Sequence, residues 1–182
     1  MSLEEYLRLE EQAECKSEYH GGHIVAMAGA TRNHSLIASN LLRGLGGLLP
    51  GACEIHGSDL KLYIASLSKV LYPDVTVICG PPAYAQQRKD LVLNPQLIVE
   101  VLSDGTEAYD RGDKFACYRQ IPTLREYLLV SQRQPMIEIF RREGQFWVLS
   151  YAEGLDAELL VQTAGAPLPL AGVYRGVEWD LK

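Results

Sequence analysis

Two short apolar runs in the middle of the chain each enclose one acidic residue. Asp74 lies within residues 71–78, and Glu100 lies within residues 97–102, where most other side chains are apolar. Runs of this length and composition predict strands that are covered on both faces. A carboxylate in such a strand is unfavourable unless a metal ion, a basic partner or a hydrogen bond compensates its burial. Both acids are therefore candidates for a functional site.

Apolar residues spaced three or four positions apart predict three helices elsewhere in the chain. The first helix begins with a capping-box pattern, because Glu5 follows Ser2 by three positions. Pro50-Gly51 ends the second helix, and Ile121-Pro122 ends the third. The expected helices span residues 3–13, 34–49 and 107–120, with Ser2, Asn33 and Thr106 as their N-terminal caps.

Strands are expected where β-branched, aromatic and aliphatic residues form short runs between turn residues. Gly21-Gly22 marks the turn of one hairpin, and Arg142-Glu143-Gly144 marks the turn of a second. A β-rich tail with Pro167 and Pro169 follows, which we expect to extend the sheet or to form a dimer surface. The expected strands cover residues 18–27 (as a hairpin), 53–64, 71–79, 96–102, 126–130, 136–140 and 145–149.

This order of elements predicts a mixed α/β fold with an N-terminal helix and hairpin and a β-rich C-terminal extension. The chain has 182 residues and 47% hydrophobic content, which suits a single domain over residues 1–182 with a substantial core. The acidic N-terminus lacks a signal-peptide pattern, and no apolar stretch approaches the roughly 20 residues that a membrane span needs. We expect a cytoplasmic protein with no membrane partner.

The cysteines indicate the redox state of the protein, and the net charge argues against one kind of nucleic-acid binding. The four cysteines form no CxxC pair, and we expect them to be reduced, mostly buried thiols. The formal net charge of −6 argues against a protein that coats nucleic acid without specificity, although a locally basic groove is compatible with it.

Strand geometry suggests how the two acids could act together. Side chains alternate across a strand, so Asp74 shares a face with Thr76, and Glu100 shares a face with Ile98. If the two strands are neighbours in register, the carboxylates converge. Two carboxylates with water and phosphate oxygens are suitable ligands for Mg²⁺ or Mn²⁺, so a divalent cation is the expected cofactor. Such a cation would polarise a phosphate and lower the pKa of an attacking water.

At these residues the chain resembles the PD-(D/E)XK nuclease superfamily and, within it, the Uma-two family of restriction endonuclease domains. The resemblance covers about residues 1–140, and the ordered set is more specific than Pro-Asp alone. The matching pieces are Glu18 with Gly21-Gly22, Met27-Ala28-Gly29, His34, Asp59, Tyr72-Pro73-Asp74-Val75, Val99-Glu100-Val101-Leu102-Ser103, Tyr109-Asp110-Arg111, Lys114, Tyr118 and Glu126-Tyr127.

The resemblance implies a restriction-endonuclease-like core and Mg²⁺-dependent cleavage of phosphodiester bonds in DNA. It implies Asp74 and Glu100 as metal ligands. The superfamily places a lysine two residues after the second acid, where this chain has Leu102. We expect Lys114, on the following helix, to replace it, with Asp110 four residues earlier holding its amine. Hydrolysis of both DNA strands by a single-site enzyme favours a homodimer.

Three further residues are auxiliary candidates, and each has a plainer interpretation. Asp59 and Lys61 would share a strand face, so Asp59 is either a further metal ligand or a surface charge. Glu18 could reach the site from the N-terminal region or simply precede a turn. His34 could help a helix N-terminus bind phosphate or be an ordinary first-turn residue.

The main candidates have plainer interpretations too. Asp74 could be a strand-end turn residue, and Glu100 could belong to a buried ion pair. Lys114 could form an ordinary salt bridge with Asp110 on a solvated helix face. The alternative function is a catalytically silent nucleic-acid-binding or dimerisation module on the same scaffold. An enzyme that uses the same carboxylates on a small molecule is a third hypothesis.

Overall fold

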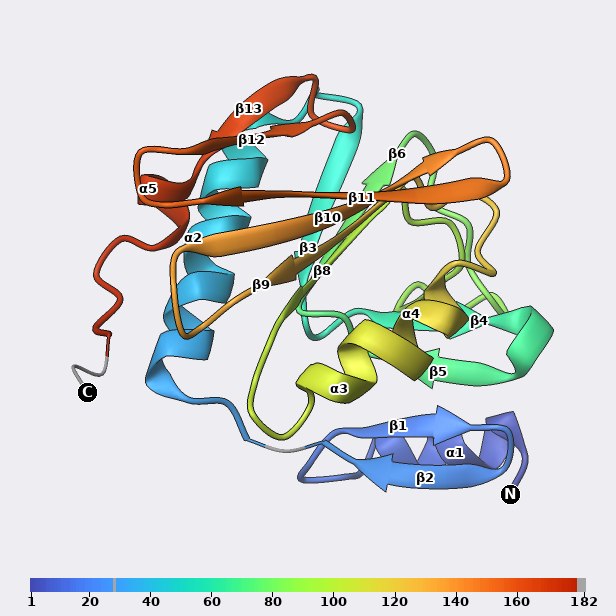
Figure 1. Cartoon of the computed structure of the whole chain (residues 1–182). Helices are drawn as coiled ribbons and strands as arrows, with labels where there is room; N and C mark the ends of the chain where they lie inside the picture. The colour runs from blue at the N-terminus through green and yellow to red at the C-terminus, as the bar shows by residue number, and fades with distance from the viewer. Residues whose placement is uncertain (28, 180–182) are drawn as a thin grey trace.

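The computed structural model describes residues 1–27 and 29–179. Its centre is a six-stranded sheet in the order β11-β10-β9-β8-β6-β3 (Figure 1). β8 and β9 run parallel, and the other neighbours run antiparallel. The strands are β3 (Cys53–Gly57), β6 (Val75–Cys79), β8 (Leu97–Val101), β9 (Glu126–Val130), β10 (Met136–Glu143) and β11 (Phe146–Glu153).

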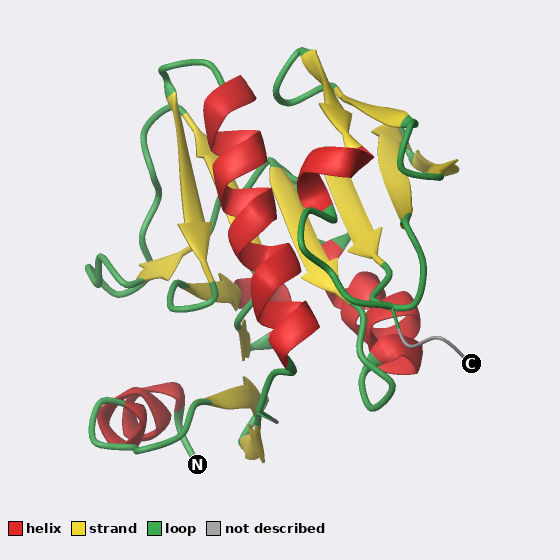
Figure 2. Cartoon of the chain, turned by 90° about the vertical axis from the view of Figure 1, so that its left-hand side faces the viewer, coloured by secondary structure: helices red, strands yellow, loops and turns green. Residues whose placement is uncertain are grey.

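Both faces of this sheet are covered, as its apolar strands predict. Helix α2 (Arg32–Leu48) packs its buried leucines and Ile37 against one face, and Figure 2 shows it crossing that face. The opposite face is covered partly by residues of the second sheet and partly by one short helical region. It consists of α3 (Glu107–Tyr109), the π-helical segment η2 (Asp110–Lys114) and α4 (Phe115–Tyr118). The expected mixed α/β class is confirmed.

A second, five-stranded sheet in the order β2-β1-β5-β4-β7 lies beside the N-terminal helix α1 (Leu3–Glu10). Ser2 and Glu5 form the expected capping box, in which the Glu5 amide donates to Ser2 Oγ and the Ser2 amide donates to Glu5 Oε2. The strands are β1 (Ser17–His20), β2 (His23–Ala26), β4 (Lys61–Ile64), β5 (Lys69–Leu71) and β7 (Leu91–Val92), with a 3₁₀ turn, η1, at Ala65–Leu67.

Two of the expected strands are wrong in extent, because the chain crosses from one sheet to the other within each. The run 53–64 divides at a turn after Gly57, and the run 71–79 divides around Pro73. Proline has no amide hydrogen to continue a strand ladder, and Ser58-Asp59 is typical of a turn. Asp74 therefore lies at a crossing between the two sheets, directly before β6.

Several helix boundaries also differ from the expectation. The cap of α2 is Thr31, whose Oγ1 accepts from the His34 amide at 3.1 Å, whereas Asn33 bonds the Glu178 carbonyl instead. Thr106 makes no side-chain cap bond to α3. The first helix ends at Glu10 rather than near residue 13. The predictions of Asn33 and Thr106 as caps are therefore wrong, because several polar residues at each of these helix starts could serve and tertiary contacts select among them.

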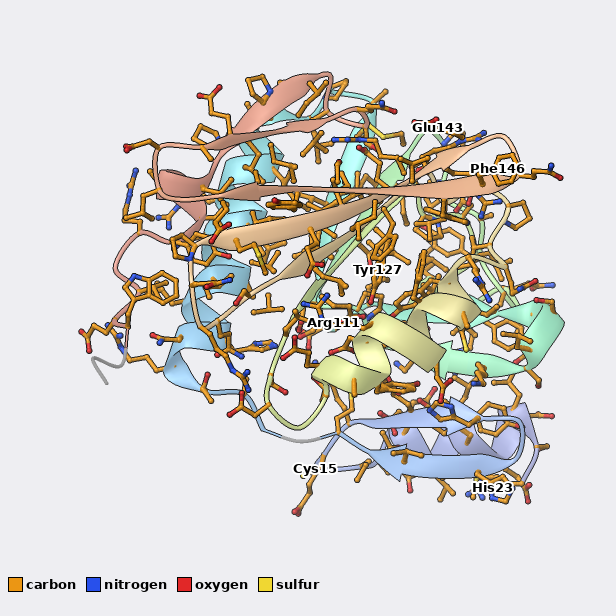
Figure 3. All side chains as sticks on the ribbon, in the orientation of Figure 1. Cys15, His23, Arg111, Tyr127, Glu143 and Phe146 are labelled. Carbon is orange, nitrogen blue, oxygen red and sulfur yellow. A yellow bond between two sulfur atoms is a disulfide. The ribbon has the colours of Figure 1, made fainter. Side chains whose placement is uncertain are left out.

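The C-terminal part adds to the core without enlarging the large sheet beyond β11. The second hairpin is longer than expected, and Glu143 and Phe146 flank its tip (Figure 3). The tail then forms a separate two-stranded sheet, β12 (Glu158–Val161) and β13 (Ala166–Pro169), followed by α5 (Leu170–Val173). Buried Glu126 fastens this tail, because its carboxylate accepts from the amides of Gln162 and Thr163. The expectation that the tail extends the sheet is therefore wrong for β12 and β13.

The expectation of four reduced thiols is also wrong. Cys53 and Cys79 form a disulfide, because the antiparallel register of β3 and β6 places them directly opposite each other. Cys117 is a buried free thiol, and Cys15, labelled near the N-terminal hairpin in Figure 3, is an exposed one. Within residues 1–27 and 29–179, no helix has the length and apolar character that a membrane span requires.

Candidate active site

A cleft of about 760 Å³ lies between the N-terminal hairpin, the start of α2 and the ends of β6 and β8. The residues proposed for the site from the sequence all line it. These residues are Glu18, His34, Asp59, Asp74, Glu100, Asp110 and Lys114. They come from both sheets, from α2 and from η2, so the cleft brings together segments that are far apart in the chain.

Asp74 is held in place by contacts from two elements. Its Oδ2 accepts a hydrogen bond from the Val101 amide at 2.8 Å. The same oxygen lies 3.2 Å from His34 Nε2 on the first turn of α2. Since Val75 pairs with Val99 in the antiparallel register, Asp74 lies beside Glu100 at the end of the ladder. The structure therefore brings the two acids to one end of neighbouring strands.

Glu100 is almost completely buried, at 3% exposure. The Tyr118 hydroxyl donates to its Oε1 at 2.6 Å, and Lys114 Nζ lies 2.9 Å from the same oxygen. Burial raises the pKa of Glu100 to about 8, and the negative charges of Asp74 and Asp110 act in the same direction, against Lys114 and Tyr118. Its other oxygen, Oε2, receives no hydrogen bond from the residues that the structure describes. One face of this carboxylate is therefore tied to the protein, and the other remains for a ligand.

Lys114 is buried among carboxylates from three separate elements. Its Nζ lies 2.9 Å from Glu100, 3.5 Å from Asp110 and 3.6 Å from Glu18. Burial alone would lower the pKa of the amine, but the three carboxylates outweigh it and hold the pKa above its usual range. The side chain is therefore an ammonium at neutral pH, and it can donate hydrogen bonds but cannot accept a proton.

The π-helical segment η2 explains how this ammonium reaches the site. A π-turn closes i→i+5 hydrogen bonds, so it is wider than an α-turn and changes the direction of the residues that follow. Asp110 begins the segment and Lys114 ends it, and Tyr118 follows one turn later. The Tyr127 hydroxyl donates to the Asp110 carbonyl at 2.9 Å, which fixes the segment to β9 (Figure 3). Both Lys114 and Tyr118 thus face Glu100.

Asp110 lies where the sequence spacing to Lys114 predicts. It is 2% exposed, and its Oδ1 makes no hydrogen bond within the described residues, apart from its ion pair with Lys114. Burial raises the pKa of Asp110, and the charge of Asp74 adds to this effect, whereas Lys114 and Thr106 oppose it. Asp110 is therefore a positioning residue for the ammonium.

Glu18 enters the site from the N-terminal hairpin. It is buried, at 6% exposure, and His20 Nε2 lies 3.2 Å from its Oε2. The Tyr109 hydroxyl also donates to Oε2, at 3.4 Å. The carboxylate thus joins β1 to α3 and adds negative charge around Lys114. Glu18 therefore does more than precede a turn: its carboxylate contacts residues of the cleft.

His34 contacts Asp74 rather than an open helix N-terminus. Burial would lower the pKa of His34, but the hydrogen bond and the charge of Asp74 outweigh it and raise the pKa. The imidazole therefore partly neutralises Asp74 and orients it. The proposed phosphate-binding role of His34 stays a prediction.

Asp59 is not placed as the sequence pattern suggested. It lies on the turn between β3 and β4, not on a strand face shared with Lys61. Its side chain is 95% exposed and forms an ion pair with Lys16, whereas Lys61 pairs with Asp90 at 2.9 Å. Asp59 therefore lies at the rim of the cleft, away from the buried carboxylates.

The donor set suits a cation that keeps most of its water. Within residues 1–27 and 29–179, no group of three or more His, Cys, Asp or Glu side chains is arranged to hold a metal. Mg²⁺ is commonly bound through one or two carboxylates together with water and substrate phosphates. Asp74 and Glu100 provide two such carboxylates. Three acidic side chains also surround the single amine of Lys114. The residues therefore fit a divalent cation of this kind.

Two contacts in the site did not follow from the sequence argument. Tyr118 was matched by resemblance, but its hydrogen bond to Glu100 does not follow from that resemblance. Tyr109 was matched by resemblance only, yet its ring lies under the Lys114 amine and its hydroxyl reaches Glu18. A tyrosine four residues from a buried lysine is the one signal that could have identified Tyr118. Leu102 is buried in an apolar cluster with Ile98 and Phe115, so a lysine there would lack its polar surroundings.

Comparison with known proteins identifies relatives along most of the chain. The uncharacterized protein slr1290 of Synechocystis sp. is 40% identical over 182 residues, covering 97% of this chain and 93% of the relative. The uncharacterized protein sll1609 of the same organism is 40% identical over 165 residues, covering 87% and 91%. Neither name states an activity.

A solved structure from Anabaena variabilis, described as "a putative nuclease belonging to DUF820", has the same fold. The TM-score is 0.75, with 17% sequence identity, and the match covers 96% of this chain and 97% of that chain. The restriction-endonuclease-like core that the sequence predicts is thereby confirmed at the level of the fold. A family model described as "Putative restriction endonuclease" matches residues 3–170. The chain therefore belongs to the Uma2 family.

Proposed function

We propose that this protein is a metal-dependent endonuclease that hydrolyses phosphodiester bonds in DNA. The family description "Putative restriction endonuclease" and the fold shared with the Anabaena variabilis protein described as "a putative nuclease" support a nuclease. The observation that carries the proposal is the 2.9 Å contact between Lys114 Nζ and Glu100 Oε1. This contact pairs an acid with a lysine beside Asp74. The position where the superfamily pattern has its lysine, two residues after Glu100, is occupied by Leu102.

Asp74 and Glu100 would hold Mg²⁺ or Mn²⁺. When bound, such a cation lowers the pKa of an attacking water and polarises the phosphate. Lys114 would supply a fixed positive charge to the phosphate as negative charge develops on it. Asp110 and Glu18 hold the ammonium, Tyr118 holds Glu100, and His34 holds Asp74. The burial of these groups strengthens each electrostatic contact, because the surrounding dielectric is low.

The proposal is tested by cleavage assays on supercoiled plasmid, linear duplex, single-stranded and branched DNA, with Mg²⁺ or Mn²⁺ and with EDTA. We expect cation-dependent cleavage of at least one substrate, and loss of that cleavage in Asp74→Asn and Glu100→Gln. Glu158→Gln is the matched control, because Glu158 is exposed on β12 and far from the cleft in sequence and in fold. Cleavage that survives in both site variants would contradict the proposal.

A catalytically silent binding or dimerisation module is the second candidate. It is favoured by Leu102 at the usual lysine position and by the net charge of −6. Metal binding without cleavage of any of these substrates would support it. Processing of free nucleotides but not DNA would instead support a small-molecule enzyme. A homodimer and a cytoplasmic location stay predictions, which sedimentation and cell fractionation would test.

A further inference from the structure

The buried part of the cleft gathers more acidic than basic side chains. Glu18, Asp74, Glu100 and Asp110 meet there. Lys114 is the ammonium that contacts three of these carboxylates, at 2.9 to 3.6 Å. Lys16, which also lines the cleft, pairs with exposed Asp59 at the rim. Lys114 is thus the internal counter-cation for three of the four acids, and His34 contacts the fourth, Asp74.

Glu100 is the point at which this counter-cation and a metal ion would meet. The carboxylate is tied to Lys114 and Tyr118 through Oε1, and a metal shared with Asp74 would draw on the same negative charge. Two cations close to one buried carboxylate repel each other, and low dielectric makes that repulsion strong. Each should therefore weaken the binding of the other, by the same factor.

We propose that Lys114 and the divalent cation are coupled through Glu100, so that the ammonium weakens cation binding in the substrate-free protein. The inference rests on the proposed function, because it takes Asp74 and Glu100 as the cation ligands. Binding of the cation would loosen the contact between Lys114 and Glu100. The ammonium would keep two partners, Asp110 and Glu18, and would become available to a phosphate.

This coupling gives a reason for the number of carboxylates around Lys114. One partner would suffice to neutralise an ammonium. Three partners from β8, η2 and β1 allow it to lose Glu100 and remain anchored. Substrate phosphate would then offset the repulsion between the two cations, so metal and DNA should bind cooperatively.

The test measures the affinity for Mn²⁺ by calorimetry, without DNA, in the full chain. We expect Lys114→Met to bind Mn²⁺ about tenfold more tightly than the wild type, within the usual range of coupling between two sites. Lys16→Met is the matched control, because it removes the same charge from the rim of the same cleft, and we expect a change below about twofold. Lys114→Arg keeps the charge and should bind no more tightly than the wild type.

A measurement on the wild type keeps the inference testable if Lys114→Met does not fold. Magnesium titration of ¹⁵N-lysine-labelled protein should shift the Lys114 side-chain resonance and leave that of Lys16 unchanged. Unchanged or weaker Mn²⁺ binding in folded Lys114→Met, or an unmoved Lys114 resonance at saturation, would overturn the coupling alone. Absence of saturable binding in the wild type would overturn the proposed metal site as well, so the two failures are distinguishable.

Discussion

Lys114 Nζ lies 2.9 Å from Glu100 Oε1, although the lysine belongs to the helical region after β8 and the acid lies within β8. The position two residues after Glu100 is filled by Leu102, which packs in the apolar cluster under α4. In the proposed site, the helical region therefore supplies the ammonium that the superfamily pattern places on the strand. Asp110 and Glu18 complete the surroundings of the ammonium.

Removing the ammonium should abolish catalysis without removing the metal ligands. We expect Lys114→Met to reduce plasmid cleavage by about 10²–10³-fold, the usual effect of losing one donor to a developing negative charge. Single-turnover cleavage at saturating Mn²⁺ measures this effect separately from metal affinity. Lys89→Met, at an exposed lysine outside the residues that line the cleft, should cleave at the wild-type rate. Equal losses in both variants would argue against a specific role for Lys114.

Asp110 should matter for the position of Lys114, whereas its neighbour on the same segment should not. Asp110→Asn removes one carboxylate from the buried ammonium, so we expect cleavage to fall, because the amine is less firmly held. Burial raises the pKa of Asp110, so its charge is costly in the fold at neutral pH, and we expect the free energy of unfolding to rise rather than fall. Asp113→Asn is the matched control, since Asp113 is exposed on η2. Urea unfolding and cleavage rates of both variants provide the comparison, and similar values for the two would contradict the assignment.

The metal-free protein should lose stability as pH rises from about 5 to about 8. The pKa of Glu100 is raised to about 8 by burial. Between its ordinary value and this value, the folded state binds more protons than the unfolded state, so unfolding becomes easier as pH increases. The raised pKa of His34 acts in the same direction, since that stabilisation is lost as pH rises through its folded value.

Urea unfolding in EDTA at several pH values between 5 and 8 measures this effect, which should be on the order of a few kcal/mol. Glu100→Gln should show a flatter profile, because it removes the main titrating group. Stability that rises with pH in the wild type, or an identical profile in the variant, would show that Glu100 ionises normally.

The disulfide makes a simple prediction for thiol chemistry. Denatured, non-reduced protein should contain two reactive thiols, Cys15 and Cys117, and reduction should release two more from Cys53 and Cys79. In the native state only exposed Cys15 should react quickly. Thiol titration with and without reductant measures this. Four reactive thiols before reduction would indicate that the cysteines are reduced, as is usual for cytosolic proteins.

The convergence of Asp74 and Glu100 could be predicted because it depends on local rules. Alternation of side chains along a strand, and the tendency of strands that follow each other in the chain to pair, favour both acids at one end of neighbouring strands. Lys114 could be predicted in part, since its spacing from Asp110 is a helical neighbour relationship.

The remainder of the site depends on contacts that no local pattern contains. Asp59 was expected on a strand, but the chain leaves the large sheet after Gly57, and turn residues carry it to the rim. Glu18 reaches Lys114 only because the N-terminal hairpin packs across the cleft. The π-turn at η2 and the disulfide between Cys53 and Cys79 likewise depend on tertiary packing and strand register.

A crystal soaked in Mn²⁺ would decide whether the two acids share a cation. We expect one strong anomalous peak in contact with the carboxylates of both Asp74 and Glu100, and no such peak in crystals of Glu100→Gln. A peak held by Glu18 and Asp110 instead, or no peak in the cleft at saturating Mn²⁺, would contradict the proposed site.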